Sequence, residues 1–154
     1  MNNQEGVGYM PYIMTSASLF AADSILKYCV EKGWIKDSEP GKGIMIKKHH
    51  NRGAMMNICD KNQQFIAVLS LVFSAFMTGV FAATLGRKGK STLKTGLALI
   101  LGGAYSNTYD RLKRKYVVDY VSFKFSSIVF NLADFCIIIG AMLLVISELG
   151  SGQE

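Results

Sequence analysis

One segment constrains the fold more than any other: the 21 residues from Phe65 to Leu85 include no charged side chain. A helix of about 20 apolar residues is long enough to cross roughly 30 Å of hydrocarbon. Of the 154 residues, 50% are hydrophobic and 18% are charged, and the apolar residues lie in blocks rather than at the regular spacing of a soluble domain. This layout excludes a disordered chain, a collagen-like repeat and a disulfide-stapled secreted domain, and it argues against an ordinary soluble enzyme.

Three further segments have the length of a membrane span. We expect the four spans at about residues 7–30, 65–85, 93–109 and 128–149. The third is rich in small residues, which allow helices to pack closely in lipid. The whole chain, residues 1–154, is therefore predicted to be a single membrane domain, an all-α bundle of four transmembrane helices.

Two long polar connections join the first span to the second and the third to the fourth. Ile44–His50, leading to a turn at Asn51–Gly53, is predicted to be an edge strand. Tyr116–Phe123 is predicted to be a second strand because its residues are mostly β-branched or aromatic. With an even number of spans, both connections lie on the same side of the membrane, where we expect them to form a small β-rich element.

The formal net charge of +6 raises the question of an anionic partner. The basic residues cluster between apolar blocks without interleaved aromatic residues, which favours anionic lipid headgroups over nucleic acid. Lys and Arg number four in the short turn after the second span, and seven and five in the two long connections. The positive-inside rule, applied to these counts, places the long connections in the cytoplasm. No Cys or His spacing indicates a zinc site.

Ionisable residues in membrane spans are costly and are candidates for function. Asp134 lies near the start of the fourth span, three residues after Asn131, and Asn107 and Arg111 share a helical face at the end of the third. Asp119 interrupts an otherwise apolar strand. Two simpler interpretations stay open: Asn131 and Asp134 cap a helix, and Asp119 is an exposed strand position.

If the third and fourth spans pack antiparallel, Asp119 and Asp134 come together at one face of the membrane. Two carboxylates a few Å apart share a proton, because both cannot ionise at low cost. One then accepts a proton from water while the other donates to a carbonyl oxygen. This is the chemistry of metal-free peptide hydrolysis, so no metal or cofactor is expected.

The residues also resemble a known family. Gly102–Arg111 (GGAYSNTYDR), Val117–Tyr120 (VVDY) and Phe130–Asp134 (FNLAD) are similar to motifs of the lipoprotein signal peptidases, also called signal peptidase II. Asp23 and Lys27 in the first span and Asn51–Ala54 in the first connection extend the resemblance over nearly the whole chain.

The sequence departs from the family pattern at three places. Ser106 stands where Gly is usual, and Tyr120 stands where Phe is usual. Met55–Asn57 replaces an Ala-Phe-Ser type of sequence in the loop expected to shape the substrate pocket. The choice of substrate is the property that this last departure affects.

The resemblance implies a four-span aspartic endopeptidase of the bacterial inner membrane. Such an enzyme removes the signal peptide from diacylglyceryl-modified prolipoproteins, cutting just before the lipidated cysteine at the outer face, so the β-rich element would be extracytoplasmic despite the charge count. Its partners would be prolipoproteins and membrane lipids, and we expect a monomer.

The resemblance also implies roles for individual residues. It makes Asp119 and Asp134 the catalytic pair, and it assigns substrate binding or positioning to four polar residues, Asn51, Asn107, Arg111 and Asn131. Asp23 and Lys27, four residues apart on a helix, can satisfy each other. With Asp110, they are expected to be structural polar residues.

Two other functions are compatible with the sequence. One is a non-enzymatic four-span protein, either a proton-coupled carrier or a scaffold whose polar residues hold the bundle together. The other is a member of the family that has drifted to a different lipid-anchored substrate.

Overall fold

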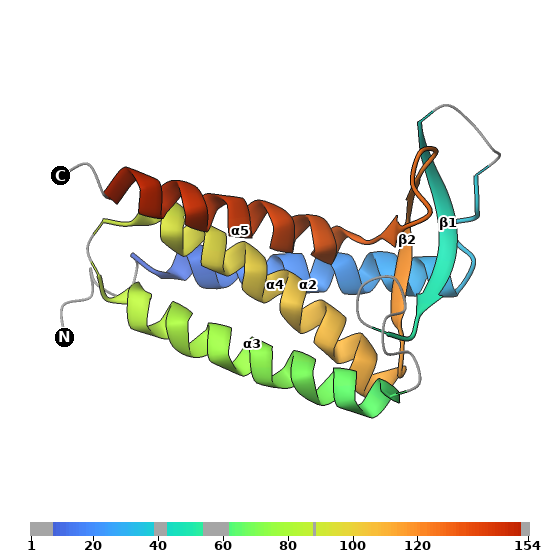
Figure 1. Cartoon of the computed structure of the whole chain (residues 1–154), viewed down its shortest axis with the longest axis horizontal. Coiled ribbons are helices and arrows are strands. Elements are labelled where there is room, and N and C mark those ends of the chain that lie inside the picture. Colours follow the sequence, from blue (N-terminus) through green and yellow to red (C-terminus); the bar gives the residue numbers. More distant parts are fainter. Residues whose placement is uncertain (1–7, 39–42, 54–61, 88, 152–154) are drawn as a thin grey trace.

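The computed structural model describes residues 8–38, 43–53, 62–87 and 89–151. Four long helices lie side by side: α2 (Met10–Glu31), α3 (Gln63–Leu85), α4 (Ser91–Lys113) and α5 (Leu132–Ser151). A small sheet of β1 (Ile44–Asn51), β2 (Val117–Phe123) and β3 (Val129–Phe130) lies at one end of them (Figure 1). The turn between α3 and α4 lies at the opposite end.

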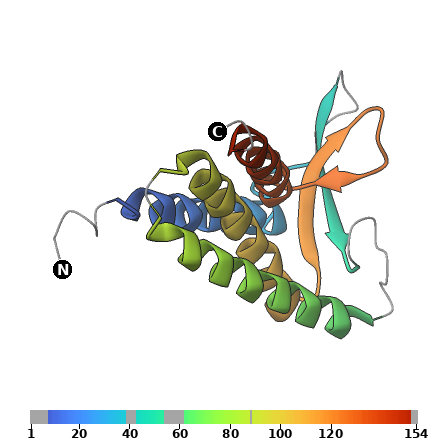
Figure 2. The same ribbon diagram turned by 60° about the vertical axis from the view of Figure 1, so that its left-hand side comes forward.

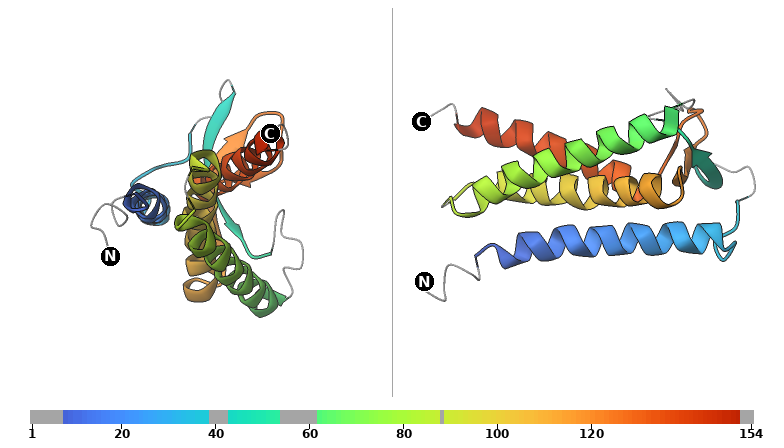
Figure 3. Two further views of the ribbon diagram at one scale, coloured as in Figure 1. Left: turned by 90° about the vertical axis from the view of Figure 1, so that its left-hand side faces the viewer. Right: turned by 90° about the horizontal axis from the view of Figure 1, so that it is seen from below.

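Helix α4 is the centre of the bundle. It packs against α2, α3 and α5, and the end-on view in Figure 3 has these three helices arranged around it. Small residues permit the contact with α5, since a Cβ built on Gly96 would lie 2.8 Å from the Gly140 carbonyl oxygen. The predicted role of small residues in the third span is therefore confirmed. Helices α4 and α5 run antiparallel, as expected (Figure 1).

Among the described residues, three helices are long and apolar enough to cross a membrane: Met10–Glu31, Gln63–Leu85 and Leu132–Gly150. The chain is thus a mostly helical membrane protein with three candidate apolar spans. Much of the surface of α3 is apolar and exposed, as in Val72 and Phe76, which suits contact with lipid. Helix α4 has a comparable length but is less apolar, and its buried residues include Lys94, Asn107 and Asp110.

The predicted start of the fourth span is wrong by four residues. Helix α5 begins at Leu132 rather than at Ile128, because Val129 and Phe130 pair with β2 as a short strand. The other helices differ from their predicted spans by a few residues at each end, and Val7 lies outside the described residues.

The three strands form an antiparallel sheet in the order β1-β2-β3, which stands beside the helix ends in Figure 2. Both predicted strands are present, and β1 extends one residue beyond its predicted end, to Asn51. A bulge between Ile46 and His49 interrupts the pairing of β1 with β2 next to Asp119. Such bulges bend a strand and re-aim its side chains.

Two apolar clusters hold these elements in place. Met77 and Phe81 of α3 pack with Leu97 and Leu101 of α4 in the half of the bundle away from the sheet. At the sheet end, Val30 of α2 packs with Val118 and Tyr120 of β2. The second cluster fixes β2, and with it Asp119, against the helices.

Candidate active site

Asp119 is buried in the middle of β2, with 2% of its surface exposed. The interpretation of Asp119 as an exposed strand position is therefore wrong. Burial raises the pKa of Asp119 to about 7, and repulsion from Asp134 adds to this effect. Hydrogen bonds from Asn131 and Asn51 and the charge of Lys27 act in the opposite direction. A carboxyl group with this pKa exchanges a proton readily near neutral pH.

Asp134 lies in the first turn of α5 and forms a reciprocal cap with Asn131. The Asn131 backbone N–H donates to Asp134 Oδ2 at 3.0 Å, and the Asp134 N–H donates to Asn131 Oδ1 at 2.9 Å. This pattern is a capping box, which starts the helix at Leu132. The capping interpretation is confirmed, and Asn131 lies at the N-cap, immediately before the first residue of α5. Both residues also have partners outside the cap: Asn131 donates to Asp119 and Asn107, and Asp134 accepts from Asn107.

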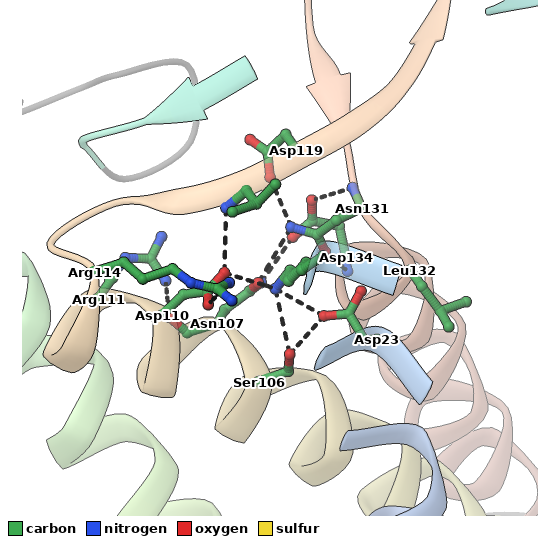
Figure 4. A network of polar contacts seen from close by, with 12 residues as sticks. Asp23, Ser106, Asn107, Asp110, Arg111, Arg114, Asp119, Asn131, Leu132 and Asp134 are labelled. Atoms are coloured by element: carbon green, nitrogen blue, oxygen red, sulfur yellow. Dashed lines mark hydrogen bonds and ion pairs between the residues drawn. The ribbon is translucent and has the colours of Figure 1, made fainter. Parts of the chain in front are cut away.

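The Asn131 side chain links the two aspartates (Figure 4). Its Nδ2 donates to Asp119 Oδ1 at 2.6 Å and to Asn107 Oδ1 at 3.2 Å. Asn107 Nδ2 in turn donates to Asp134 Oδ1 at 2.9 Å. Both oxygens of Asp134 thus accept N–H groups, an arrangement that stabilises the ionised carboxylate.

Arg111 lies one helical turn after Asn107 on α4, close to the end of β1. Its guanidinium donates to the Asn107 carbonyl at 3.5 Å and to the Gly53 carbonyl at 3.4 Å. Its Nε is buried and has no hydrogen-bond partner among the described residues. Asn51, the last residue of β1, lines the same cavity as Arg111. Ala54 and Met55–Asn57, which follow it, lie outside the described residues.

Behind the aspartates lies a buried ion-pair network. Lys27, completely buried, contacts Asp23 Oδ2 at 2.7 Å and Asp110 Oδ2 at 3.4 Å, and it donates to Asn107 Oδ1 at 2.7 Å. The expected pairing of Asp23 with Lys27 is therefore present. Asp110 pairs with Arg114 at 2.6 Å and accepts the Val118 backbone N–H, so it ties the end of α4 to β2.

Two residues of this network, Ser106 and Tyr120, were not predicted as site residues. The Ser106 hydroxyl donates to Asp23 Oδ2 at 2.6 Å, and the Tyr120 hydroxyl donates to Asp23 Oδ1 at 3.1 Å. Burial and the charge of Asp23 raise the pKa of Tyr120 above its ordinary value, so the phenol keeps its proton. The available signal was that these hydroxyls stand at two of the positions where the sequence departs from the family pattern.

A cavity of about 190 Å³ is lined by both predicted catalytic residues and by three of the four predicted positioning residues. Its polar lining consists of Asn51, Asn107, Arg111, Asp119 and Asp134, and its apolar lining includes Val129, Phe130 and Ile137. A second, more open groove of about 460 Å³ leads to Asp134 between α3, α4 and α5. Within the described ranges, no three His, Cys, Asp or Glu residues are grouped closely enough to hold a metal ion.

Comparison with known proteins agrees with this geometry. The family model described as signal peptidase (SPase) II matches residues 15–150. Two solved structures of bacterial membrane enzymes have the same fold, each at 20% sequence identity. One has a TM-score of 0.78 over 93% of this chain and 90% of the other, and the second has 0.75 over 90% and 92%.

Proposed function

Because this chain belongs to the signal peptidase II family, it is an aspartic-type membrane enzyme that cleaves signal peptides from lipoproteins, and we propose that Asp119 and Asp134 are its catalytic pair. The observation that carries the proposal is that Asn131 binds both aspartates: its side-chain amide donates to Asp119, and its backbone N–H donates to Asp134. Both carboxyl groups line one cavity with room for water.

We infer different roles for the two groups from their hydrogen bonds and from the pKa of Asp119. Asp119, with its pKa raised to about 7, carries the shared proton, and Asp134, which accepts two N–H groups, is ionised. Asp134 takes a proton from water as the water oxygen bonds to the scissile carbonyl carbon, and Asp119 gives its proton to the carbonyl oxygen. When the tetrahedral intermediate collapses, the C–N bond breaks, Asp134 protonates the leaving nitrogen, and the hydroxyl proton returns to Asp119.

The remaining polar residues hold the substrate backbone and the pair. The unpartnered Nε of Arg111 is free to donate to a peptide carbonyl, since the cavity adjoins it. Asn51 reaches the same cavity from the sheet, while Asn107 and Asn131 fix the carboxylates. An asparagine or arginine in such a place positions groups without taking part in proton transfer.

We propose that the substrate is a prolipoprotein whose cysteine carries diacylglyceryl, and that cleavage falls just before this cysteine. Its apolar signal segment enters from the membrane through the open groove. The groove is lined by α3 residues such as Leu69 and Phe73, about half exposed, and ends at Asp134. The lipid chains remain in hydrocarbon throughout, which avoids the cost of exposing them to water.

We also propose the place of the enzyme in the cell. All four helices cross the inner membrane of a bacterium, with the sheet and the aspartates at the outer face and the basic α3–α4 turn in the cytoplasm. The family membership supports this orientation against the charge count. The many basic residues of the sheet end would face anionic lipid headgroups. One chain supplies every residue of the pair and its hydrogen-bond partners, so a monomer is sufficient.

The test is a cleavage assay on a synthetic diacylglyceryl-cysteine prepeptide in detergent or lipid. The parent enzyme is expected to release the signal peptide, and Asp119→Asn and Asp134→Asn are each expected to abolish release. Glu148→Gln, at the far end of α5, is the matched control and should retain parent activity. Parent-level cleavage by either aspartate variant would remove the proposed mechanism.

A further inference from the structure

The Asp23 carboxylate is enclosed by three donors from three elements. Lys27 of α2 lies 2.7 Å from Oδ2, and the Ser106 hydroxyl of α4 donates to the same oxygen at 2.6 Å. The Tyr120 hydroxyl of β2 donates to Oδ1 at 3.1 Å. Asp23 is 1% exposed, so these groups replace water around it. A buried charge is stable only when it is paired and hydrogen-bonded in this way.

The Tyr120 hydroxyl also has a second partner. Its only hydrogen goes to Asp23, so its oxygen is free to accept, and the Leu132 backbone N–H donates to it at 3.1 Å. Leu132 is the first residue of α5, and an N–H in the first turn of a helix has no partner within that helix. One buried oxygen atom therefore joins α2, β2 and the start of α5.

The two segments joined by this hydroxyl are those that carry the aspartates. Asp119 is the residue before Tyr120 on β2, and Asp134 is two residues after Leu132 on α5. We propose that Tyr120 is a positioning residue, whose hydroxyl fixes the strand that carries Asp119 against the helix that carries Asp134. This inference rests on the proposed catalytic role of the two aspartates.

The Ser106 hydroxyl helps the Tyr120 hydroxyl to hold Asp23 in place. Ser106 binds the other oxygen of Asp23 and also accepts from Lys27 at 3.3 Å, so it helps to orient the carboxylate that Tyr120 binds. Removal of the Tyr120 hydroxyl would leave Asp23 Oδ1 and the Leu132 N–H without these hydrogen bonds inside the protein. Displacement of a reacting group by about 1 Å is enough to reduce a rate about 100-fold, which makes such a bridge consequential.

The first experiment compares Tyr120→Phe with Tyr105→Phe in the prepeptide assay. Tyr105 bonds Thr78 on an exposed part of the helix surface, so its variant loses a phenol hydroxyl away from the aspartates. We expect Tyr120→Phe to lower kcat about 10-fold or more with KM changed less than about 2-fold, and Tyr105→Phe to match the parent.

The dependence of kcat on pH separates positioning from simple stabilisation. If the aspartates move apart, they repel less, and the acidic and basic limbs of the profile come closer together in Tyr120→Phe. Ser106→Ala should shift the limbs in the same direction with a smaller loss of kcat. Because both hydroxyls act through Asp23, the losses in the double variant should be non-additive.

Three outcomes overturn this inference while the proposed function stands. The first is a kcat of Tyr120→Phe equal to that of the parent. The second is a lower melting temperature of Tyr120→Phe with an unchanged dependence of kcat on pH. The third applies if Tyr120→Phe does not fold, and is an unchanged dependence of kcat on pH in Ser106→Ala. Failure of the parent enzyme to cleave the prepeptide would instead overturn the proposed function, and this inference with it.

Discussion

Replacing Asp119 with asparagine tests whether this buried carboxyl group costs the protein stability. Its pKa is raised from 3.8 to about 7, roughly three units, and each unit corresponds to about 1.4 kcal/mol. Such a group favours the folded state most when it is protonated. The stability it contributes is therefore fully present below pH 3.8 and is lost as the pH rises to 7. The total loss is about 4 kcal/mol.

Asparagine has nearly the same shape and cannot ionise, so Asp119→Asn avoids this loss. It can still accept a hydrogen bond from Asn131, and it no longer repels Asp134. We expect the variant to exceed the parent in free energy of unfolding by about 1–2 kcal/mol at pH 5 and by about 4 kcal/mol at pH 8. The same variant should be inactive.

The measurement is thermal unfolding of both proteins in one detergent at pH 5 and pH 8. The gain of about 2–3 kcal/mol between these pH values corresponds to a melting-temperature difference that grows by roughly 5 °C or more. Glu148→Gln, exposed at the other end of α5, controls for loss of a carboxylate and should follow the parent. An advantage for Asp119→Asn that is no larger at pH 8 than at pH 5 would refute the reasoning.

Three other outcomes follow from the site and its surroundings. Cleavage should decline as the pH rises through about 7, because Asp119 then loses the proton it donates, and a rate profile that keeps rising to pH 9 would contradict this. Gly103→Ala should destabilise the protein by about 2 kcal/mol and reduce activity, because its Cβ would lie 2.5 Å from the Ala133 carbonyl oxygen. The control in the same unfolding assay is Gly79→Ala, which should be neutral or stabilising because the space around Gly79 is open. Lys27→Met should lower the free energy of unfolding by about 3 kcal/mol or more, because it leaves the buried Asp23 carboxylate without its cation. Equal stability of variant and parent would exclude a structural role for Lys27.

The parts of the fold that could be predicted are those determined by the composition of a single segment. The uncharged block at Phe65–Leu85 predicts α3, and the β-branched run before Phe123 predicts β2. The start of α5 was missed because an apolar run does not distinguish a strand that pairs with β2 from the first turn of a helix. The capping box of Asn131 and Asp134 decides the boundary, and it was visible as a spacing of three residues.

The candidate site was predictable as a set of residues, but not as a network. The motifs give Asp119 and Asp134, and a spacing of four predicts the pair of Asp23 with Lys27. The roles of Ser106 and Tyr120 depend on contacts among α2, α4, β2 and α5, and no spacing along the chain encodes such contacts. A hydroxyl group among small or apolar residues can be recognised as part of the network only once the arrangement of the helices is known.

The polar character of α4 has a consequence for how the protein is made. Its buried residues include Lys94, Asn107 and Asp110, whose partners come from α2, α5 and flanking segments. On leaving the ribosome, α4 precedes α5, so for a time it lacks the helix with which it makes its most extensive contact. Lipid is a poor surrounding for these groups alone. If α4 crosses the membrane as proposed, we expect its stable integration to await synthesis of α5. A nascent chain stopped after Lys113 should then be held by the insertion machinery rather than released into the bilayer.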